Sequence, residues 1–110
     1  MTVSELASQL SLKTVTGCVT EENFDGVYAG DLLSRAMSHV ETGNLWITIM
    51  SNSNVIAVAS LTECAAVILA ESVELMPDAL SAAEENGILV LSSDMTVYEL
   101  CVKIGELDHE

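Results

Sequence analysis

Short apolar runs alternate with segments of helical periodicity along most of the chain. Residues 45–49 and 66–69 are almost wholly aliphatic or aromatic, and each run has the length of one buried strand. Such alternation is typical of βα units that build a largely parallel sheet. It predicts strands at residues 12–17, 27–29, 45–49, 66–69 and 88–91, and helices at residues 2–10, 31–40, 54–62, 77–86 and from Asp94 or Thr96 to about Ile104.

Local signals support the first and last of these helices. Thr2 and Glu5 have the spacing of a capping box at the start of the first helix. The last helix has an apolar stripe at the spacing i, i+3, i+4, i+7, formed by Val97, Leu100, Cys101 and Ile104. The charged tail that follows, residues 106–110, is expected to fray.

Residues 54–62 are rich in Val and Ile and have the composition of a strand. Two parallel strands, however, need a crossover of a dozen or so residues, and a helix opened by Ser53 or Asn54 supplies one. We therefore expect a helix here. Because it is apolar almost all round, we expect it to be covered by the sheet and by something else, such as a second subunit.

The spacing of the first two strands does not decide how they pair. Residues 12–17 and 27–29 are too close for a helical crossover, so the two strands either form a hairpin or lie in different parts of the sheet. The expected fold is one α/β domain over residues 1–110, a three-layer α/β/α arrangement. Its sheet has about five strands. It is expected to be mostly parallel, and a mixed sheet is the alternative.

Composition adds an expectation of self-association. Half of the 110 residues are apolar and the mean hydropathy is +0.44, yet the chain has one Phe, one Trp and two Tyr. This much aliphatic surface exceeds what one small domain needs to bury, which favours a homodimer.

The net charge of −14 limits the classes of partner that the protein can bind. Lys13, Arg35 and Lys103 are the basic residues, against seventeen acidic ones. Nucleic acid and anionic membrane are poor partners for such a surface, because both are bound through Lys and Arg. The polar block at residues 51–54 interrupts the longest uncharged run, so no membrane span is expected. A cytoplasmic location is expected, because no basic and apolar leader opens the chain.

The residue types that carry catalysis are not arranged for it. Cys18, Cys64 and Cys101 are widely spaced without a CxxC pair, so neither disulfide nor zinc site is indicated. His39 falls in the last turn of its helix with no nucleophile placed beside it, and His109 lies in the tail. The paired glutamates at 21–22 and 84–85 suit a solvated surface better than a metal site. We expect no catalytic residue, no metal and no cofactor.

Residues 26–31 superficially look like a glycine-rich turn into a helix, but they match neither the dinucleotide fingerprint nor the P-loop. Asp31 is better explained as a helix cap or a partner of the helix dipole.

Polar loops follow three of the expected strands. In open parallel sheets ligands bind at the carboxyl ends of strands, where loops meet helix N-termini. Hydroxyl and amide groups in these loops are candidates for binding a neutral polar ligand: Asn52, Ser53, Ser72 and Ser93. The same residue types are also ordinary helix caps, and both interpretations stay open.

The chain resembles the DRTGG domain family, which is related to the amino-terminal domain of HPr kinase/phosphorylase and occurs beside CBS domains in some pyrophosphatases. The matching stretches lie at residues 28–34, 45–49, 54–61 and 87–92. The family's polar and double-glycine signature is absent, because Ala70, Glu71 and Ser72 stand where its glycines are expected.

The resemblance implies a regulatory or assembly module without catalysis of its own, often involved in dimer contacts. Relatives are attached to enzymes, whereas this domain is expected to stand alone. The expected function is therefore a non-catalytic domain that self-associates and docks a partner enzyme or signalling protein. The alternative is a sensor of a small molecule, such as an adenine nucleotide, bound at the carboxyl ends of the strands.

Overall fold

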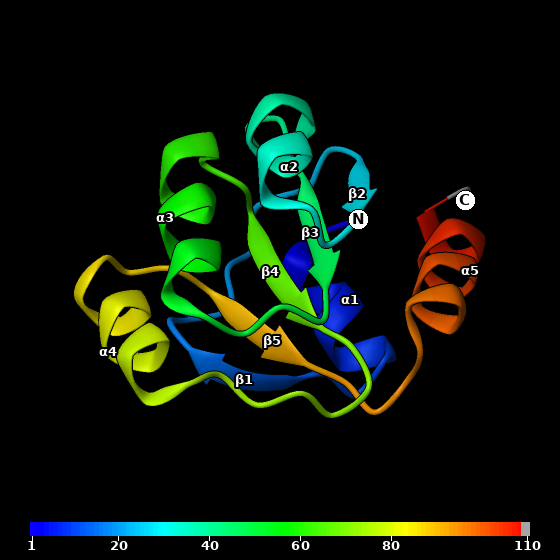
Figure 1. Ribbon diagram of the computed structural model, residues 1–110. Coiled ribbons are helices and arrows are strands. Elements are labelled where there is room, and N and C mark those ends of the chain that lie inside the picture. Colours follow the sequence, from blue (N-terminus) through cyan, green and yellow to red (C-terminus); the bar gives the residue numbers. More distant parts are fainter. Residues whose placement is uncertain (109–110) are drawn as a thin grey trace.

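The protein is a five-stranded sheet with helices on both faces, described here from a computed structural model over residues 1–108 (Figure 1). The sheet order is β1-β5-β4-β3-β2. The elements in chain order are α1 (Val3–Gln9), β1 (Lys13–Thr16), β2 (Val27–Ala29), α2 (Leu33–His39), β3 (Leu45–Thr48), α3 (Ser53–Thr62), β4 (Ala66–Leu69), α4 (Pro77–Glu85), β5 (Val90–Ser92) and α5 (Val97–Asp108).

The sheet is mixed, with a single antiparallel strand at one edge. Strands β2, β3, β4 and β5 pair in parallel, whereas β1 pairs antiparallel with β5. The first two strands thus lie at opposite edges of the sheet and form no hairpin. The prediction of a mostly parallel α/β fold is confirmed, and the open question of a mixed sheet is answered.

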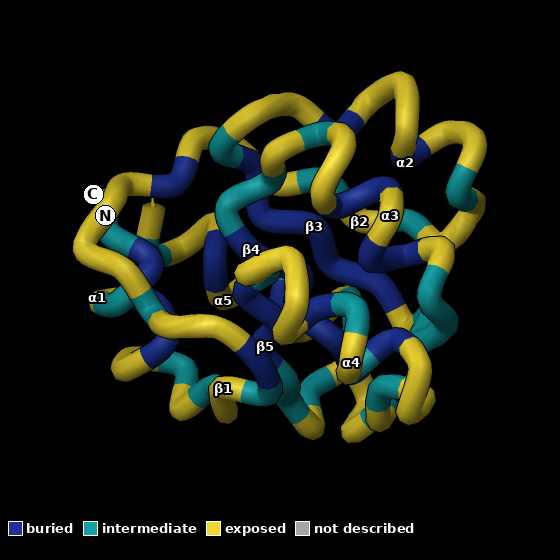
Figure 2. Tube along the Cα trace, turned by 90° about the vertical axis from the view of Figure 1, so that its left-hand side faces the viewer, coloured by how far each residue is buried: buried dark blue, intermediate teal, exposed yellow. Residues whose placement is uncertain are grey.

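Alternating side chains of the central strands serve two separate cores. Leu45 and Ile47 of β3 pack with α1 and α5, whereas Trp46 packs with α2, α3 and α4. Figure 1 shows α2, α3 and α4 along one face of the sheet, as three successive right-handed crossovers would place them. Buried backbone is concentrated in the strands and on the inward sides of the helices (Figure 2).

Residues 53–62 form a helix, as the topological argument predicted against strand propensity. Val55, Ile56 and Val58 are buried toward the sheet and the neighbouring helices, while Leu61 is 67% exposed. Within residues 1–108 the sheet covers the inner side of α3, and α2 and α4 flank it. Its outer side lies at the surface.

Several expected boundaries were wrong by one or more residues. Strand β5 begins at Val90, because Ile88 N–H still donates to Ala83 O and closes α4. Residues 106–108, which were expected to fray, belong to helix α5, which ends at Asp108. His109 and Glu110 lie outside the described residues.

Asp31 was expected to be a helix cap or a partner of the helix dipole, and the first of these two expectations was wrong. The N-cap of α2 is Leu32, without a side-chain hydrogen bond. Asp31 Oδ1 instead accepts hydrogen bonds from Thr48 Oγ1 at 2.7 Å and from Ile49 N at 3.0 Å. This carboxylate fastens the end of β2 to the end of β3.

Replacing Asp31 tests this fastening. Asp31→Ala removes the acceptor of two hydrogen bonds and leaves the buried Thr48 hydroxyl without it, so we expect a loss of about 1–2 kcal/mol in the free energy of unfolding. Asp31→Asn keeps an acceptor oxygen and is the matched control. Urea unfolding followed by Trp46 fluorescence measures both, and equal losses in the two variants would contradict the assignment.

Candidate functional site

The carboxyl ends of β3, β4 and β5 meet at one edge of the sheet, together with the amino end of antiparallel β1. Ser72 and Ser93, expected from the sequence to bind a ligand, come together there: Ser72 N donates to Ser93 O at 2.8 Å. Lys13 of β1 lies directly across from Ser92 of β5 in the strand register.

The other two expected ligand-binding residues lie apart from this pair. Asn52 is the N-cap of α3, and its Oδ1 accepts a hydrogen bond from Asn54 N at 3.0 Å. Ser53 is the first residue of that helix. Capping therefore accounts for Asn52, and neither residue contributes to the pocket described next.

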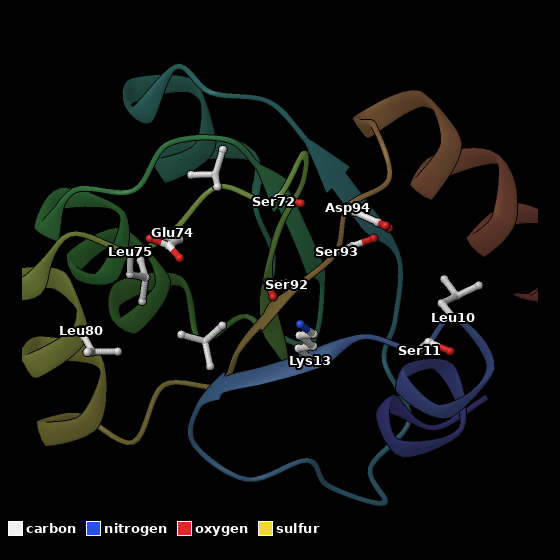
Figure 3. A pocket seen from close by; sticks show the side chains of 12 residues that line it. Leu10, Ser11, Lys13, Ser72, Glu74, Leu75, Leu80, Ser92, Ser93 and Asp94 are labelled. Atoms are coloured by element: carbon white, nitrogen blue, oxygen red, sulfur yellow. The ribbon is translucent and has the colours of Figure 1, made fainter.

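A pocket of about 690 Å³ opens beside Ser72 and Ser93 (Figure 3). Its volume is in the range of small-molecule sites. Apolar, hydroxyl and charged side chains all take part in its wall: Leu10, Ser11, Lys13, Val15, Ser72, Val73, Glu74, Leu75, Leu80, Ser92, Ser93 and Asp94.

The pocket lies on the face of the sheet that carries α2, α3 and α4. Val15 and Leu75 pack against the core of that face, and Leu80 comes from α4. Lys13 pairs with Ser92, which lies two residues after Val90 of that core, so Lys13 points to the same face of the sheet. Sequence reasoning missed Lys13 because its place depends on β1 pairing with β5, which no local pattern indicates.

The wall of the pocket contains both a basic side chain and several polar groups. Lys13 is the single basic residue in its wall, and Glu74 and Asp94 are the acidic ones. The hydroxyl of Ser93 accepts a hydrogen bond from Met95 N at 3.0 Å, which leaves its O–H free to donate. The site offers hydrogen bonding and one positive charge but no nucleophile paired with a base.

The loop after β4 holds the pocket in shape through its backbone. Glu71 and Ser72 both have positive φ, 58° and 59°. Glu71 N donates to Met95 O at 2.9 Å, and Ser72 N donates to Ser93 O. Two backbone amides of this loop are thus hydrogen-bonded to the loop after β5. A glutamate and a serine thus adopt the left-handed backbone that glycine favours.

Restoring glycine should therefore stabilise the chain. A left-handed non-glycine residue costs about 1–2 kcal/mol, partly offset in a glycine variant by its freer unfolded chain. We expect Ser72→Gly to raise the free energy of unfolding by about 0.5 kcal/mol, and Glu71→Gly with Ser72→Gly by about 1 kcal/mol.

The control is Ser81→Gly, at an exposed position within helix α4. It should lower the free energy of unfolding by about 0.5 kcal/mol, because glycine is a poorer helix former than serine. Chemical unfolding measures the three variants. A loss of stability in Ser72→Gly equal to that of Ser81→Gly would show that the left-handed backbone carries no strain.

The remaining candidates for chemistry stand apart from the pocket. His39 Nδ1 lies 2.9 Å from Arg35 O, and its ring stacks on Tyr28 with centroids 6.2 Å apart. Cys64 and Cys101 are partly buried, and burial raises the pKa of both thiols, that of Cys64 to about 11. Cys18 is exposed. Across residues 1–108 no group of three or more His, Cys, Asp or Glu side chains is placed to hold a metal ion.

The thiols should differ widely in reactivity. With a pKa of about 11, only about one part in a thousand of Cys64 is thiolate at pH 8. We expect Cys18 to react first with a thiol-specific disulfide reagent, Cys101 more slowly, and Cys64 last, with Cys18→Ser losing the fast phase. Mass spectrometry of partly labelled protein measures the order, and early labelling of Cys64 would contradict its burial.

The helices of residues 1–108 are all too short or too polar to cross a membrane.

Comparisons with known proteins agree with the architecture. The solved structure of the CBS and DRTGG domains of the regulatory region of Clostridium perfringens pyrophosphatase, in complex with its activator diadenosine tetraphosphate, is similar with a TM-score of 0.71. The two sequences are 10% identical, and the match covers 92% of this chain and 44% of that chain. At this identity the likeness shows a shared fold. No curated protein sequence matches the chain.

The family model of the DRTGG domain matches residues 5–107. The match covers nearly the whole chain, including the pocket and both layers of helices. The resemblance noted in the sequence is thereby confirmed, and the protein belongs to the DRTGG domain family.

Proposed function

We propose that the chain is a regulatory domain without catalysis of its own, which self-associates and docks a partner enzyme or signalling protein. Membership of the DRTGG family supports a regulatory role, because a structure of the same fold is part of the regulatory region of a pyrophosphatase. The observation that supports self-association is a pair of neighbouring helices, α2 and α3, that contain no carboxylate in an otherwise acidic molecule.

This surface, the α2–α3 face, is formed by the outer sides of two neighbouring helices. Leu32, the N-cap of α2, is 65% exposed, Met37 of α2 is 51% exposed and Leu61 of α3 is 67% exposed. Ala57 of α3 is exposed as well. Large aliphatic side chains so exposed gain free energy when a partner covers them, at roughly 25 cal/mol per Å² of buried apolar surface.

Charge supports a second copy as the occupant. The chain has seventeen acidic residues, but none lies within Leu33–His39 or Ser53–Thr62, and Arg35 lies on α2. Two molecules of charge −14 repel each other least where they meet through surfaces without carboxylates. The two helices meet that condition, with Glu41 and Glu63 just beyond their ends, and a two-fold axis would bring the α2–α3 face against itself.

Other exposed apolar residues lie among acidic ones. Tyr98 is 76% exposed on α5, beside Glu99 on the same helix. Helix α4 has Asp78, Glu84 and Glu85. These acidic faces remain open in the dimer and would steer a partner protein with a basic surface.

Charge substitutions on the α2–α3 face test the dimer. Met37→Glu and Leu61→Glu each place a carboxylate at the two-fold interface, so we expect either to weaken association at least tenfold. The wild-type protein should sediment as a dimer and the variants as monomers in analytical ultracentrifugation at micromolar concentration.

The matched control is Tyr98→Glu, which adds the same charge to an exposed apolar position on α5. It should leave the dimer intact. A wild-type chain that stays monomeric at high concentration, or three variants that behave alike, would refute the assigned interface.

A second candidate function is supported by the pocket at the carboxyl edge. Its volume of about 690 Å³ and its hydroxyl groups at Ser72, Ser92 and Ser93 suit a small-molecule sensor. An adenine nucleotide is one ligand to test, because the pyrophosphatase regulatory region of the same fold was crystallised with diadenosine tetraphosphate. Binding of either nucleotide or metabolite would make the regulation ligand-dependent.

A further inference from the structure

The pocket at the carboxyl edge has two unlike ends. The end next to α4 is mostly apolar and includes one carboxylate: Val15, Val73, Leu75 and Leu80, with Glu74 beside Leu75. The other end, where the loops after β4 and β5 meet the start of β1, is mostly polar: Ser11, Ser72, Ser93 and Asp94, with Leu10 beside Ser11. Lys13 and Ser92 lie between the two ends (Figure 3).

Lys13 is positioned to meet one anionic group. It faces Ser92 across the β1–β5 register, and Figure 3 shows its side chain rising from β1 toward that serine. An ammonium group and a serine hydroxyl together provide the donors that a carboxylate accepts. An anion held there would have the apolar end of the pocket on one side and Asp94 on the other.

The charges of the wall limit the ligand to a small negative charge. Polyphosphates are bound by several cations, by a metal ion or by a glycine-rich loop. Here one lysine is set against Glu74 and Asp94, in a molecule of charge −14. Each further negative charge on a ligand would therefore face repulsion without a second basic side chain to offset it.

We infer that this pocket binds a small aliphatic carboxylate, with its carboxyl group on Lys13 and Ser92 and its hydrocarbon part against Leu80. The inference rests on the sensor function given above as the second candidate. Such chemistry is found in a free branched-chain acid, in an aliphatic amino acid and at the carboxyl end of a short peptide. Asp94 would favour the two that also bear an ammonium group.

The experiment is a set of titrations of the full chain followed by amide chemical shifts in NMR. The probes are 4-methylpentanoate, leucine, leucyl-leucine, ADP and diadenosine tetraphosphate. We expect the carboxylates to shift the amides of Lys13, Ser72 and Ser93. Along the series from acetate to hexanoate, the affinity should rise about three- to fourfold per methylene group.

Two variants separate the roles of the two ends. Lys13→Gln should weaken 4-methylpentanoate binding about tenfold, whereas Lys103→Gln, an exposed lysine of α5, should leave it unchanged. Leu80→Ala should flatten the dependence on chain length while acetate binding stays as in the wild type. Comparing leucine with 4-methylpentanoate in Asp94→Asn reveals whether an ammonium group is recognised.

Each negative result has a distinct meaning. Nucleotide shifts at the pocket without carboxylate shifts would overturn the ligand class and leave the sensor function standing. Saturating concentrations of all five probes without any shift would overturn both. Equal affinity of the wild type and Lys13→Gln for 4-methylpentanoate would overturn the place of the carboxyl group.

Discussion

Double-sided burial of the central strands is the constraint on which the rest of this structure depends. Every side chain of β3 and β4 is buried, whichever face of the sheet it points to. Both faces must therefore be covered by helices, because a parallel sheet of aliphatic strands cannot leave either face in water. Three successive crossovers place α2, α3 and α4 on one face, and α1 and α5 cover the other.

The same division of helices creates the pocket. Each crossover helix packs over the two strands that it connects, so α2, α3 and α4 lie along the strands from β2 to β5. Strand β1 is added at the edge beyond β5 by antiparallel pairing, without a crossover helix of its own. Helix α4 is the last helix on this face, and it leaves part of β1 uncovered. The pocket lies there, and Leu80 of α4 and Val15 of β1 both line it.

Sequence reasoning reached the elements and the fold class because these follow from local periodicity and from crossover topology. The helix at residues 53–62 is the clearest example: its composition favours a strand, but the distance between two parallel strands requires a helix there. The pairing of β1 could not be decided in this way. Strand β1 pairs with β5, and the paired residues Lys13 and Ser92 are more than seventy residues apart in the sequence. No local pattern encodes such a contact.

The candidate site was predicted only in part, for the same reason. Ser72 and Ser93 follow strands, so the rule for parallel sheets placed them at one edge. Lys13 is the first residue of its strand, so only antiparallel pairing brings it to that edge. Asn52 satisfies the same rule as the serines, but its side chain is already engaged as the cap of α3.

Charge links the two surfaces that carry the functional proposals. A molecule of charge −14 repels both a second copy of itself and most metabolites, which are anionic. Arg35 lies at the edge of the α2–α3 face and Lys13 lies in the pocket, so two of the three basic residues fall on these surfaces. On such an acidic protein, the electrostatic repulsion of an anion or of another acidic protein is weakest near the basic residues.

The loop after β4 shows how backbone hydrogen bonds can fix the shape of a loop whatever its side chains are. Two backbone amides at Glu71 and Ser72 hold the loop after β5, and they need left-handed backbone rather than any particular side chain. Glycine provides that backbone without strain, but this chain keeps the geometry with a glutamate and a serine. Because hydrogen bonds of the main chain fix the shape of the pocket, the side chains in its wall are free to diverge. Serine at residue 72 also places a hydroxyl in the wall of the pocket, where glycine would leave only a hydrogen.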